Sequence, residues 1–214
     1  MISNWELSKK IAENISSELN FDSDKEEVIA YGIFGLLQII FSIGMIAIFG
    51  FIFGVMEEAI IISVVMAIVR KSSGGVHATS PLRCMIIGTA ICIGMSKLIL
   101  MSNPSLNTTI IINILIFIIA YYFIYKVSPV DTPNKPIKKA EKRIKLKRIS
   151  LINITVFLGV IILFICLYKH YGYYKFIMYS NCVSLGVLLQ TITLTKLGHR
   201  LFSNIDVILS KFIN

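Results

Sequence analysis

One long apolar stretch constrains this chain more than any other feature, because no charged residue occurs between positions 28 and 56. A helix needs roughly 20 apolar residues to cross about 30 Å of hydrocarbon. The 214 residues are 56% hydrophobic and only 15% charged, whereas a soluble domain carries about 25% charged residues. The sequence therefore predicts an integral membrane protein rather than a water-soluble globular domain.

Five further apolar runs follow, and each is a candidate membrane helix. The run 59–69 is short, so we expect a short or re-entrant span there, with Glu57 and Glu58 marking an outer turn. The other runs cover 84–100, 106–125, 149–168 and 176–197. Segments 1–27 and 199–214 repeat apolar residues at helical spacing, which predicts interfacial amphipathic helices at both ends. We therefore expect one all-α, polytopic domain over residues 1–214, with about six transmembrane helices.

The positions of the basic residues predict the orientation in the membrane. Lysine and arginine gather in the segments 9–25, 70–83, 126–148 and 196–211. Only Lys169 and Lys175 lie in the other connections, and Lys97 lies inside an apolar run. Because cytoplasmic loops are enriched in basic residues, both termini and segment 70–84 are expected to face the cytoplasm of a multi-pass cell-membrane protein. The net charge of +9 then indicates contact with anionic lipids and no nucleic-acid partner.

Segment 70–84 combines a nucleophile candidate with a base candidate and reads RKSSGGVHATSPLRC. A histidine can take the proton of a nearby cysteine thiol and return it to a leaving group, and His77 and Cys84 supply these two residue types. Seven residues of straight helix would hold their Cα atoms about 10 Å apart, so the chain has to fold back. Pro81 disfavours a continuous helix, and Gly74 and Gly75 permit unusual backbone angles.

A structural interpretation of the same residues stays open at this point. A cysteine at the start of an apolar helix usually serves packing, a histidine in a loop is usually solvated, and Arg70, Lys71 and Arg83 also suit membrane anchors. If the pair is catalytic, the same three basic residues favour the thiolate. A transporter or channel without covalent chemistry, or a non-catalytic scaffold, are the competing function classes. Labelling of Cys84 by a thiol-reactive probe, in a manner that depends on His77, separates catalysis from these.

The pattern Arg70-x-x-x-Gly74-Gly75-x-His77-Ala78, followed by Cys84, resembles the accessory gene regulator B (AgrB) family. The chain length, the six apolar runs and the basic connection before the fifth run are also similar to that family. The resemblance implies a membrane cysteine endopeptidase of Gram-positive quorum sensing, with His77 as general base and Cys84 as nucleophile. It also implies supporting roles for Arg70, Gly74 and Gly75.

The resemblance further implies what such an enzyme acts on. The expected substrate is a short AgrD-like precursor peptide with an amphipathic N-terminus and an acidic C-terminal tail, which is cut off before a thiolactone or lactone ring closes. Membrane lipids and, as an option, a second copy of the chain are further expected partners, whereas no cofactor or metal is expected. The basic connection 126–148 is expected to help set the topology. It also contains candidate contacts for the acidic tail: Lys138, Lys139, Lys142 and Arg143.

Overall fold

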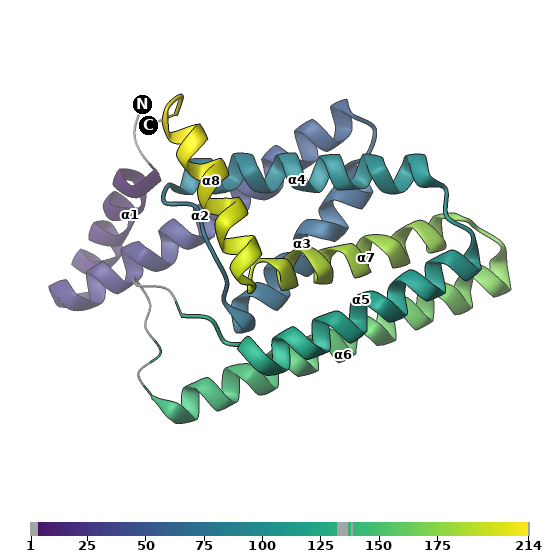
Figure 1. The fold of residues 1–214 in the computed structure, drawn as a ribbon. Helices are drawn as coiled ribbons and strands as arrows, with labels where there is room; N and C mark the ends of the chain where they lie inside the picture. Colours follow the sequence, from purple (N-terminus) through teal and green to yellow (C-terminus); the bar gives the residue numbers. More distant parts are fainter. Residues whose placement is uncertain (1–3, 132–136, 138, 214) are drawn as a thin grey trace. The chain divides into compact units, whose positions relative to one another are not determined.

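The computed structural model describes residues 4–131, 137 and 139–213. These residues form eight α-helices and no β-strand, so the all-α class is confirmed for the described part of the chain (Figure 1). The helices are α1 (Asn4–Leu19), α2 (Ser23–Ile52), α3 (Met56–Ser73), α4 (Pro81–Ser102), α5 (Leu106–Val127), α6 (Ala140–Tyr171), α7 (Lys175–Ile192) and α8 (Lys196–Ser210).

Four of the six apolar runs lie within single helices, and two are interrupted. The runs 59–69, 84–100, 106–125 and 149–168 fall inside α3, α4, α5 and α6. The first run extends past the end of α2 into a turn where Gly54 has a φ of +64°, a left-handed conformation that ends a helix. The sixth run crosses the end of α7, and α8 then leaves at a bend of 87°.

The apolar helices make this a multi-pass membrane protein, although not every helix has the length and composition of a span. Within the described residues, α2, α4, α5 and α6 are long and apolar enough to cross a membrane, and α7 with α8 adds a fifth candidate if the bent pair counts as one. Helix α3 has only 18 residues and carries charged residues in its first and last turns. The number of six spans and the interfacial placement of the terminal helices remain predictions.

The chain divides after residue 45 into two compact units. In the first unit, the rings of Trp5 on α1 and Phe34 on α2 meet edge to face with centroids 5.6 Å apart. The carboxylate of Asp22 accepts a 2.9 Å hydrogen bond from the N–H of Lys25 in the first turn of α2, which satisfies one of the free N–H groups at a helix start.

Helix α7 is the central helix of the second unit and packs against α3, α5 and α6. One buried cluster joins these four helices through residues such as Val69, Ile124, Ile154 and Val187. A second cluster joins α3, α4, α7 and the end of α2, and it includes Cys92 and Cys182. Cys92 is therefore a packing residue, as its place in an apolar run predicts.

Helices α3 and α7 approach each other closely at Gly186. A Cβ atom at this position would lie 2.8 Å from the Cβ of Val65 and 2.9 Å from the carbonyl oxygen of Ile62. Small residues at such contacts let two helix backbones approach, which is a main source of association between helices inside a membrane, where lipid is as apolar as the side chains. Gly186 thus allows the tight α3–α7 contact that supports the end of α3.

Candidate active site

The residues expected to carry the chemistry lie where α3 ends and α4 begins. Helix α3 ends at Ser73, so His77 lies in the connection, and Cys84 lies just inside α4. The N–H of Cys84 donates a 2.9 Å hydrogen bond to the carbonyl oxygen of Ser80, the N-cap residue of α4. Pro81 occupies the first turn, where its missing N–H costs no helical hydrogen bond. The predicted break in the helix between His77 and Cys84 is confirmed.

Gly74 and Gly75 turn the chain out of α3 with backbone angles that other residues rarely adopt. Their φ angles are +71° and +131°. A Cβ on Gly74 would lie 2.1 Å from the carbonyl oxygen of Val130, and a Cβ on Gly75 would lie 2.5 Å from Oγ1 of Thr193. Both positions therefore require glycine for its backbone freedom and for its small size.

The end of α7 holds this glycine segment through polar contacts. Nε2 of Gln190 donates a 2.7 Å hydrogen bond to the carbonyl oxygen of Gly74 and a 3.1 Å hydrogen bond to Oγ of Ser73. The N–H of Val76 donates 3.2 Å to the carbonyl oxygen of Thr193. Gln190 is fully buried, and its Oε1 has no hydrogen-bond partner within the described residues. Buried polar groups are normally hydrogen-bonded. Both hydrogen bonds that the Gln190 carboxamide donates go to the segment before His77.

The connection between α5 and α6 contacts the other side of the glycine segment. The N–H of Val130 donates 2.9 Å to the carbonyl oxygen of Ser73, and Val130 forms a parallel bridge with Gly74. Next to this contact, Oγ of Ser150 on α6 donates 2.9 Å to Oγ of Ser72. The end of α3 is thus fixed by hydrogen bonds from α6, from α7 and from the start of the basic connection.

Arg70 links the two halves of the candidate site electrostatically. Its Nη2 donates a hydrogen bond to the carbonyl oxygen of Val76, the residue before His77. The guanidinium charge acts on the ring of His77 and on the thiol of Cys84. Nε of Arg70 is buried without a hydrogen-bond partner in the part of the chain that the structure describes. Arg70 therefore contacts the backbone next to His77, while its supporting role in catalysis stays a prediction.

The surroundings of His77 keep its imidazole neutral at physiological pH. Although the residue is exposed, the protein mass around the ring and, after it, the charge of Arg70 lower the pKa of His77 from 6.5 to about 4. No hydrogen bond joins the His77 ring to the Cys84 sulfur among the described residues. The site thus contains a neutral imidazole on the connection between α3 and α4 and a free thiol just inside α4.

Asp206 on α8 and Gln190 on α7 are two polar residues at this site that the sequence interpretation missed. The carboxylate of Asp206 accepts hydrogen bonds from Thr79 and from Arg83. Each residue had a signal: Gln190 is one of two carboxamides in the apolar run 176–197, and Asp206 is an acid among the apolar residues of the tail helix. A polar group in such a place indicates a buried partner.

Comparison with known proteins places the chain in a family. The family model for accessory gene regulator B matches residues 8–194. The chain belongs to the AgrB family. Membership links it to the processing of autoinducing peptides, and it confirms the resemblance based on the motif around His77. No solved structure matches the chain.

Several AgrB-like relatives cover nearly the whole chain. A protein provisionally named AgrB-like from Clostridium perfringens strain SM101 is 39% identical over 212 residues, which is 97% of this chain and 98% of the relative. A second one from C. perfringens strain 13 is 38% identical over the same shares of both chains. A provisionally named AgrB-like protein of Listeria innocua is 24% identical over 91% of this chain and 90% of its own length.

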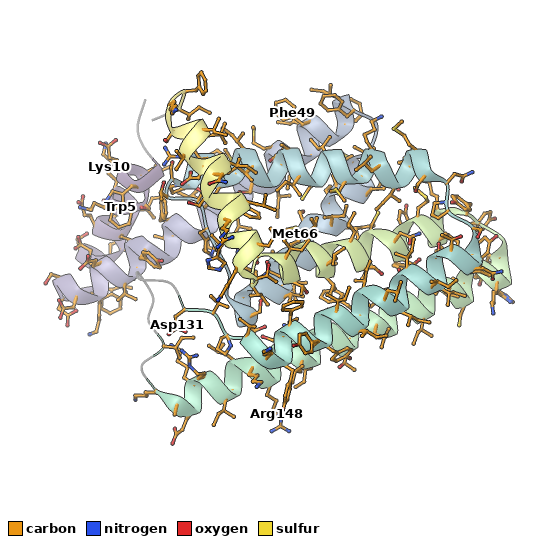
Figure 2. The ribbon with its side chains drawn as sticks, viewed as in Figure 1. Trp5, Lys10, Phe49, Met66, Asp131 and Arg148 are labelled. Carbon is orange, nitrogen blue, oxygen red and sulfur yellow. The ribbon has the colours of Figure 1, made fainter. Side chains whose placement is uncertain are left out.

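The basic residues expected to contact the substrate of an AgrB-type protein lie around the start of α6. Lys139 caps α6, and Lys142 and Arg143 follow in its first turns, whereas Lys138 lies outside the described residues. Nη2 of Arg143 donates 2.9 Å hydrogen bonds to both carboxylate oxygens of Asp131, which is labelled in Figure 2. Lys139, Lys142 and Arg143 are all exposed, but the ion pair with Asp131 makes Arg143 less available to an acidic ligand than the two lysines.

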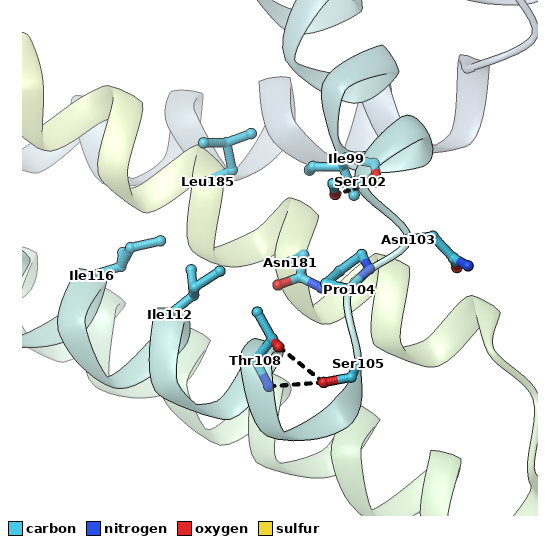
Figure 3. A pocket seen from close by; sticks show the side chains of 10 residues that line it. All are labelled: Ile99, Ser102, Asn103, Pro104, Ser105, Thr108, Ile112, Ile116, Asn181 and Leu185. Carbon is cyan, nitrogen blue, oxygen red and sulfur yellow. Dashed lines mark hydrogen bonds between the residues drawn. The ribbon is translucent and has the colours of Figure 1, made fainter.

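A cavity of about 400 Å³ lies near the end of α4 that is remote from Cys84 (Figure 3). It is lined by residues from α4, α5, α7 and the connection between α4 and α5, including Ser102, Asn103 and Asn181. Neither His77 nor Cys84 lines it. The candidate active site is therefore separate from this cavity.

Proposed function

We propose that the chain is a membrane cysteine endopeptidase that removes the C-terminal tail of a short quorum-sensing precursor peptide and promotes closure of a thiolactone or lactone ring. Membership of the AgrB family supports the peptide-processing role. The observation that carries the chemical part is the hydrogen bond from Nη2 of Arg70 to the carbonyl oxygen of Val76, which ties the end of α3 to the residue before His77. With Cys84 just inside α4, this contact supports a single site made of the imidazole and the thiol at the junction of α3 and α4.

In the proposed cleavage step, the neutral imidazole of His77 takes the proton of the Cys84 thiol. The thiolate attacks the carbonyl carbon before the acidic tail, and the positive end of α4 favours the anionic sulfur. The N–H of Gly75 is the proposed donor to the developing oxyanion. His77 then returns the proton to the leaving amine, so the C–N bond breaks and an acyl-thioester forms on Cys84.

In the proposed cyclisation step, a thiol or hydroxyl within the retained peptide attacks the acyl-thioester. The new thioester or ester bond closes the ring, the bond to the Cys84 sulfur breaks, and His77 transfers the proton of the attacking group to that sulfur. Exchange of one thioester for another is nearly balanced in energy, so this step needs no external energy source. The site has to exclude water, because hydrolysis would release a linear peptide.

We place this site on the cytoplasmic side of the cell membrane, where the substrate is an AgrD-like peptide whose amphipathic end binds the lipid surface. Lys138, Lys139, Lys142 and Arg143 are the proposed contacts of its acidic tail. The exposed lysines near the start of α6 support this role, because a positive cluster raises the encounter rate of an acidic peptide. The β-bridge between Gly74 and Val130 connects the start of the basic connection 126–148 to the candidate site.

The test uses purified full-length protein in vesicles with synthetic precursor peptides that carry an acidic tail. Cys84→Ala and His77→Ala are expected to abolish cleavage, while Cys166→Ala, a change at an exposed cysteine on α6, is expected to cleave normally. Wild-type protein quenched during turnover is expected to carry a peptide adduct on Cys84 that hydroxylamine removes. Cleavage at the wild-type rate by Cys84→Ala would contradict the proposal and favour a scaffold or transporter.

A further inference from the structure

Asp206 is a buried acid whose carboxylate accepts hydrogen bonds from three donors of the candidate active site. Its Oδ2 accepts a 2.9 Å hydrogen bond from the N–H of Thr79 and a 2.7 Å hydrogen bond from the Thr79 hydroxyl. Its Oδ1 accepts a 2.7 Å hydrogen bond from Nε of Arg83. The side chains of Asp206 and Arg83 are only 8% and 11% exposed. A buried carboxylate with this many donors is strongly constrained in position.

Arg83 extends the same network to the last described turn of the chain. Its Nη1 donates 3.0 Å to the carbonyl oxygen of Ile213, and its Nη2 donates to the hydroxyl of Thr79. A planar guanidinium binds several acceptors in fixed directions, which an exposed lysine anchor does not do. The network therefore fixes a geometry, whereas a membrane anchor needs only a charge near the lipid.

The positions of Thr79 and Arg83 in the chain connect this network to the two expected catalytic residues. Thr79 follows His77 by two residues, and Arg83 directly precedes Cys84. The carboxylate of Asp206 thus holds the stretch that separates the two expected catalytic groups. Gln190 and Thr193 hold the preceding stretch, from Ser73 to Val76.

We infer that Asp206 is a positioning residue of the proposed peptidase, and that α8 is a part of the catalytic unit. This inference rests on the proposed function. Asp206 acts through Thr79 and Arg83, since its hydrogen bonds go to these residues rather than to the thiol or the imidazole. Its role is to keep segment 79–83 in the shape that brings the sulfur of Cys84 toward the ring of His77.

The experiment compares Asp206→Ala, Asp206→Asn and the control Asn204→Ala, an exposed position on the same helix, in full-length protein reconstituted in vesicles. Folded protein is counted from the monodisperse fraction in size-exclusion chromatography before reconstitution, so a loss of folded protein lowers the count but not kcat per site. We expect kcat per site to fall on the order of tenfold to a hundredfold in Asp206→Ala, with KM unchanged, because a misplacement of about 1 Å can cost a hundredfold. Asp206→Asn keeps one acceptor oxygen and should fall between Asp206→Ala and wild type, while Asn204→Ala should match wild type.

A second readout follows alkylation of Cys84 by N-ethylmaleimide, resolved by mass spectrometry, with the control variant Asn204→Ala as reference. Release of segment 79–83 should make Cys84 react faster in Asp206→Ala than in wild type, while Asn204→Ala should match wild type. A wild-type kcat per site together with an unchanged alkylation rate of Cys84 would overturn the positioning role. Alkylation requires no cleavage, so it separates this outcome from failure of the proposed function, which wild-type cleavage by Cys84→Ala would reveal.

Discussion

The carboxamide of Gln190, in the last turns of α7, donates a 2.7 Å hydrogen bond to the carbonyl oxygen of Gly74, which caps α3. The two residues lie far apart in the sequence, and the bond joins the central helix of the unit to the segment before His77. Because the donor is fully buried, water does not replace it when it is removed. The conformation of the candidate site therefore depends on residues near the other end of the chain.

Gln190→Ala should destabilise the protein by removing this donor. Loss of the hydrogen bonds to the Gly74 carbonyl and to Oγ of Ser73 should lower the free energy of unfolding by about 1–3 kcal/mol. Asn107→Ala, a change at an exposed amide on α5, should stay within about 0.5 kcal/mol of wild type. Denaturant unfolding in detergent, followed by circular dichroism, measures both variants, and equal stability of the two would contradict the structural role of Gln190.

Gly75→Ala should impair both stability and cleavage. Its φ of +131° is unfavourable for alanine, and the added Cβ would lie 2.5 Å from Oγ1 of Thr193. The backbone strain alone costs about 1–3 kcal/mol. Gly159→Ala, on α6 with no atom within 4 Å of the new Cβ, should be neutral or slightly stabilising. Thermal unfolding and cleavage rates check the pair; a fully stable and active Gly75→Ala would show that the segment relaxes freely.

The pH dependence of cleavage should report the lowered pKa of His77. If its neutral imidazole is the base, the acidic limb of kcat/KM should lie nearer pH 4 than 6.5. Arg70→Gln removes a positive charge beside the ring and should move that limb to higher pH. Lys71→Gln, a change at an exposed neighbour, should move it less. Rates measured in vesicles from pH 4 to pH 8 test this, and an acidic limb that Arg70→Gln leaves in place would argue against His77 as the base.

The same shift has a consequence for folding stability. Between about pH 4 and 6.5 the unfolded chain binds a proton at His77 that the folded chain does not bind. The contribution of His77 to stability is therefore complete above pH 6.5 and is lost as the pH falls toward 4. The loss should disappear in His77→Gln.

Reporter fusions should reveal the orientation predicted from the basic residues. A reporter fused after Val127, at the end of α5, should be cytoplasmic, and one fused at Asn103, after α4, should be external. An alkaline phosphatase fusion, active outside, and a fluorescent protein fusion, active inside, distinguish the two sides. The reverse result would place Cys84 outside the cell and contradict the proposed mechanism.

Neutralising Lys138, Lys139, Lys142 and Arg143 together should weaken substrate capture without changing chemistry. We expect KM to rise roughly tenfold, kcat to hold, and added salt to have the same effect on wild type, because exposed charges are screened over about 8 Å at physiological ionic strength. The single change Arg143→Gln should matter less than Lys142→Gln, since Arg143 already pairs with Asp131. A correctly inserted quadruple variant with normal KM would leave only the lipid-anchor role.

Local patterns in the sequence predict much of this fold but not its long-range contacts. The position of Pro81 and the pair Gly74-Gly75 correctly indicate where α3 stops and α4 starts, because backbone geometry is a property of a few neighbouring residues. The apolar runs likewise identify the positions of the long helices. The bend after Ile192 is different. Gly198 permits it, since a Cβ there would lie 1.9 Å from the carbonyl oxygen of Ile192, but the hydrogen bond between Thr193 and Val76 at the bend joins distant parts of the chain, which no local pattern predicts.

The candidate site shows the same division between local and distant information. His77 and Cys84 are recognisable because a thiol and an imidazole on one short connection have a chemical meaning of their own. The roles of Asp206 and Gln190 depend on the donors and acceptors that the folded chain brings to them. Their polarity in apolar surroundings predicts that each has a partner, but the sequence alone does not name that partner.

The close approach of α3 and α7 at Gly186 limits how these two helices are able to move relative to each other. With so little space between their backbones, neither slides past the other without a steric clash, so they move as one rigid body. That body carries Arg70 and Gln190. The distance between these two polar residues is therefore set by a contact that neither of them makes. A substitution that enlarges Gly186 would change that spacing while leaving both side chains in place.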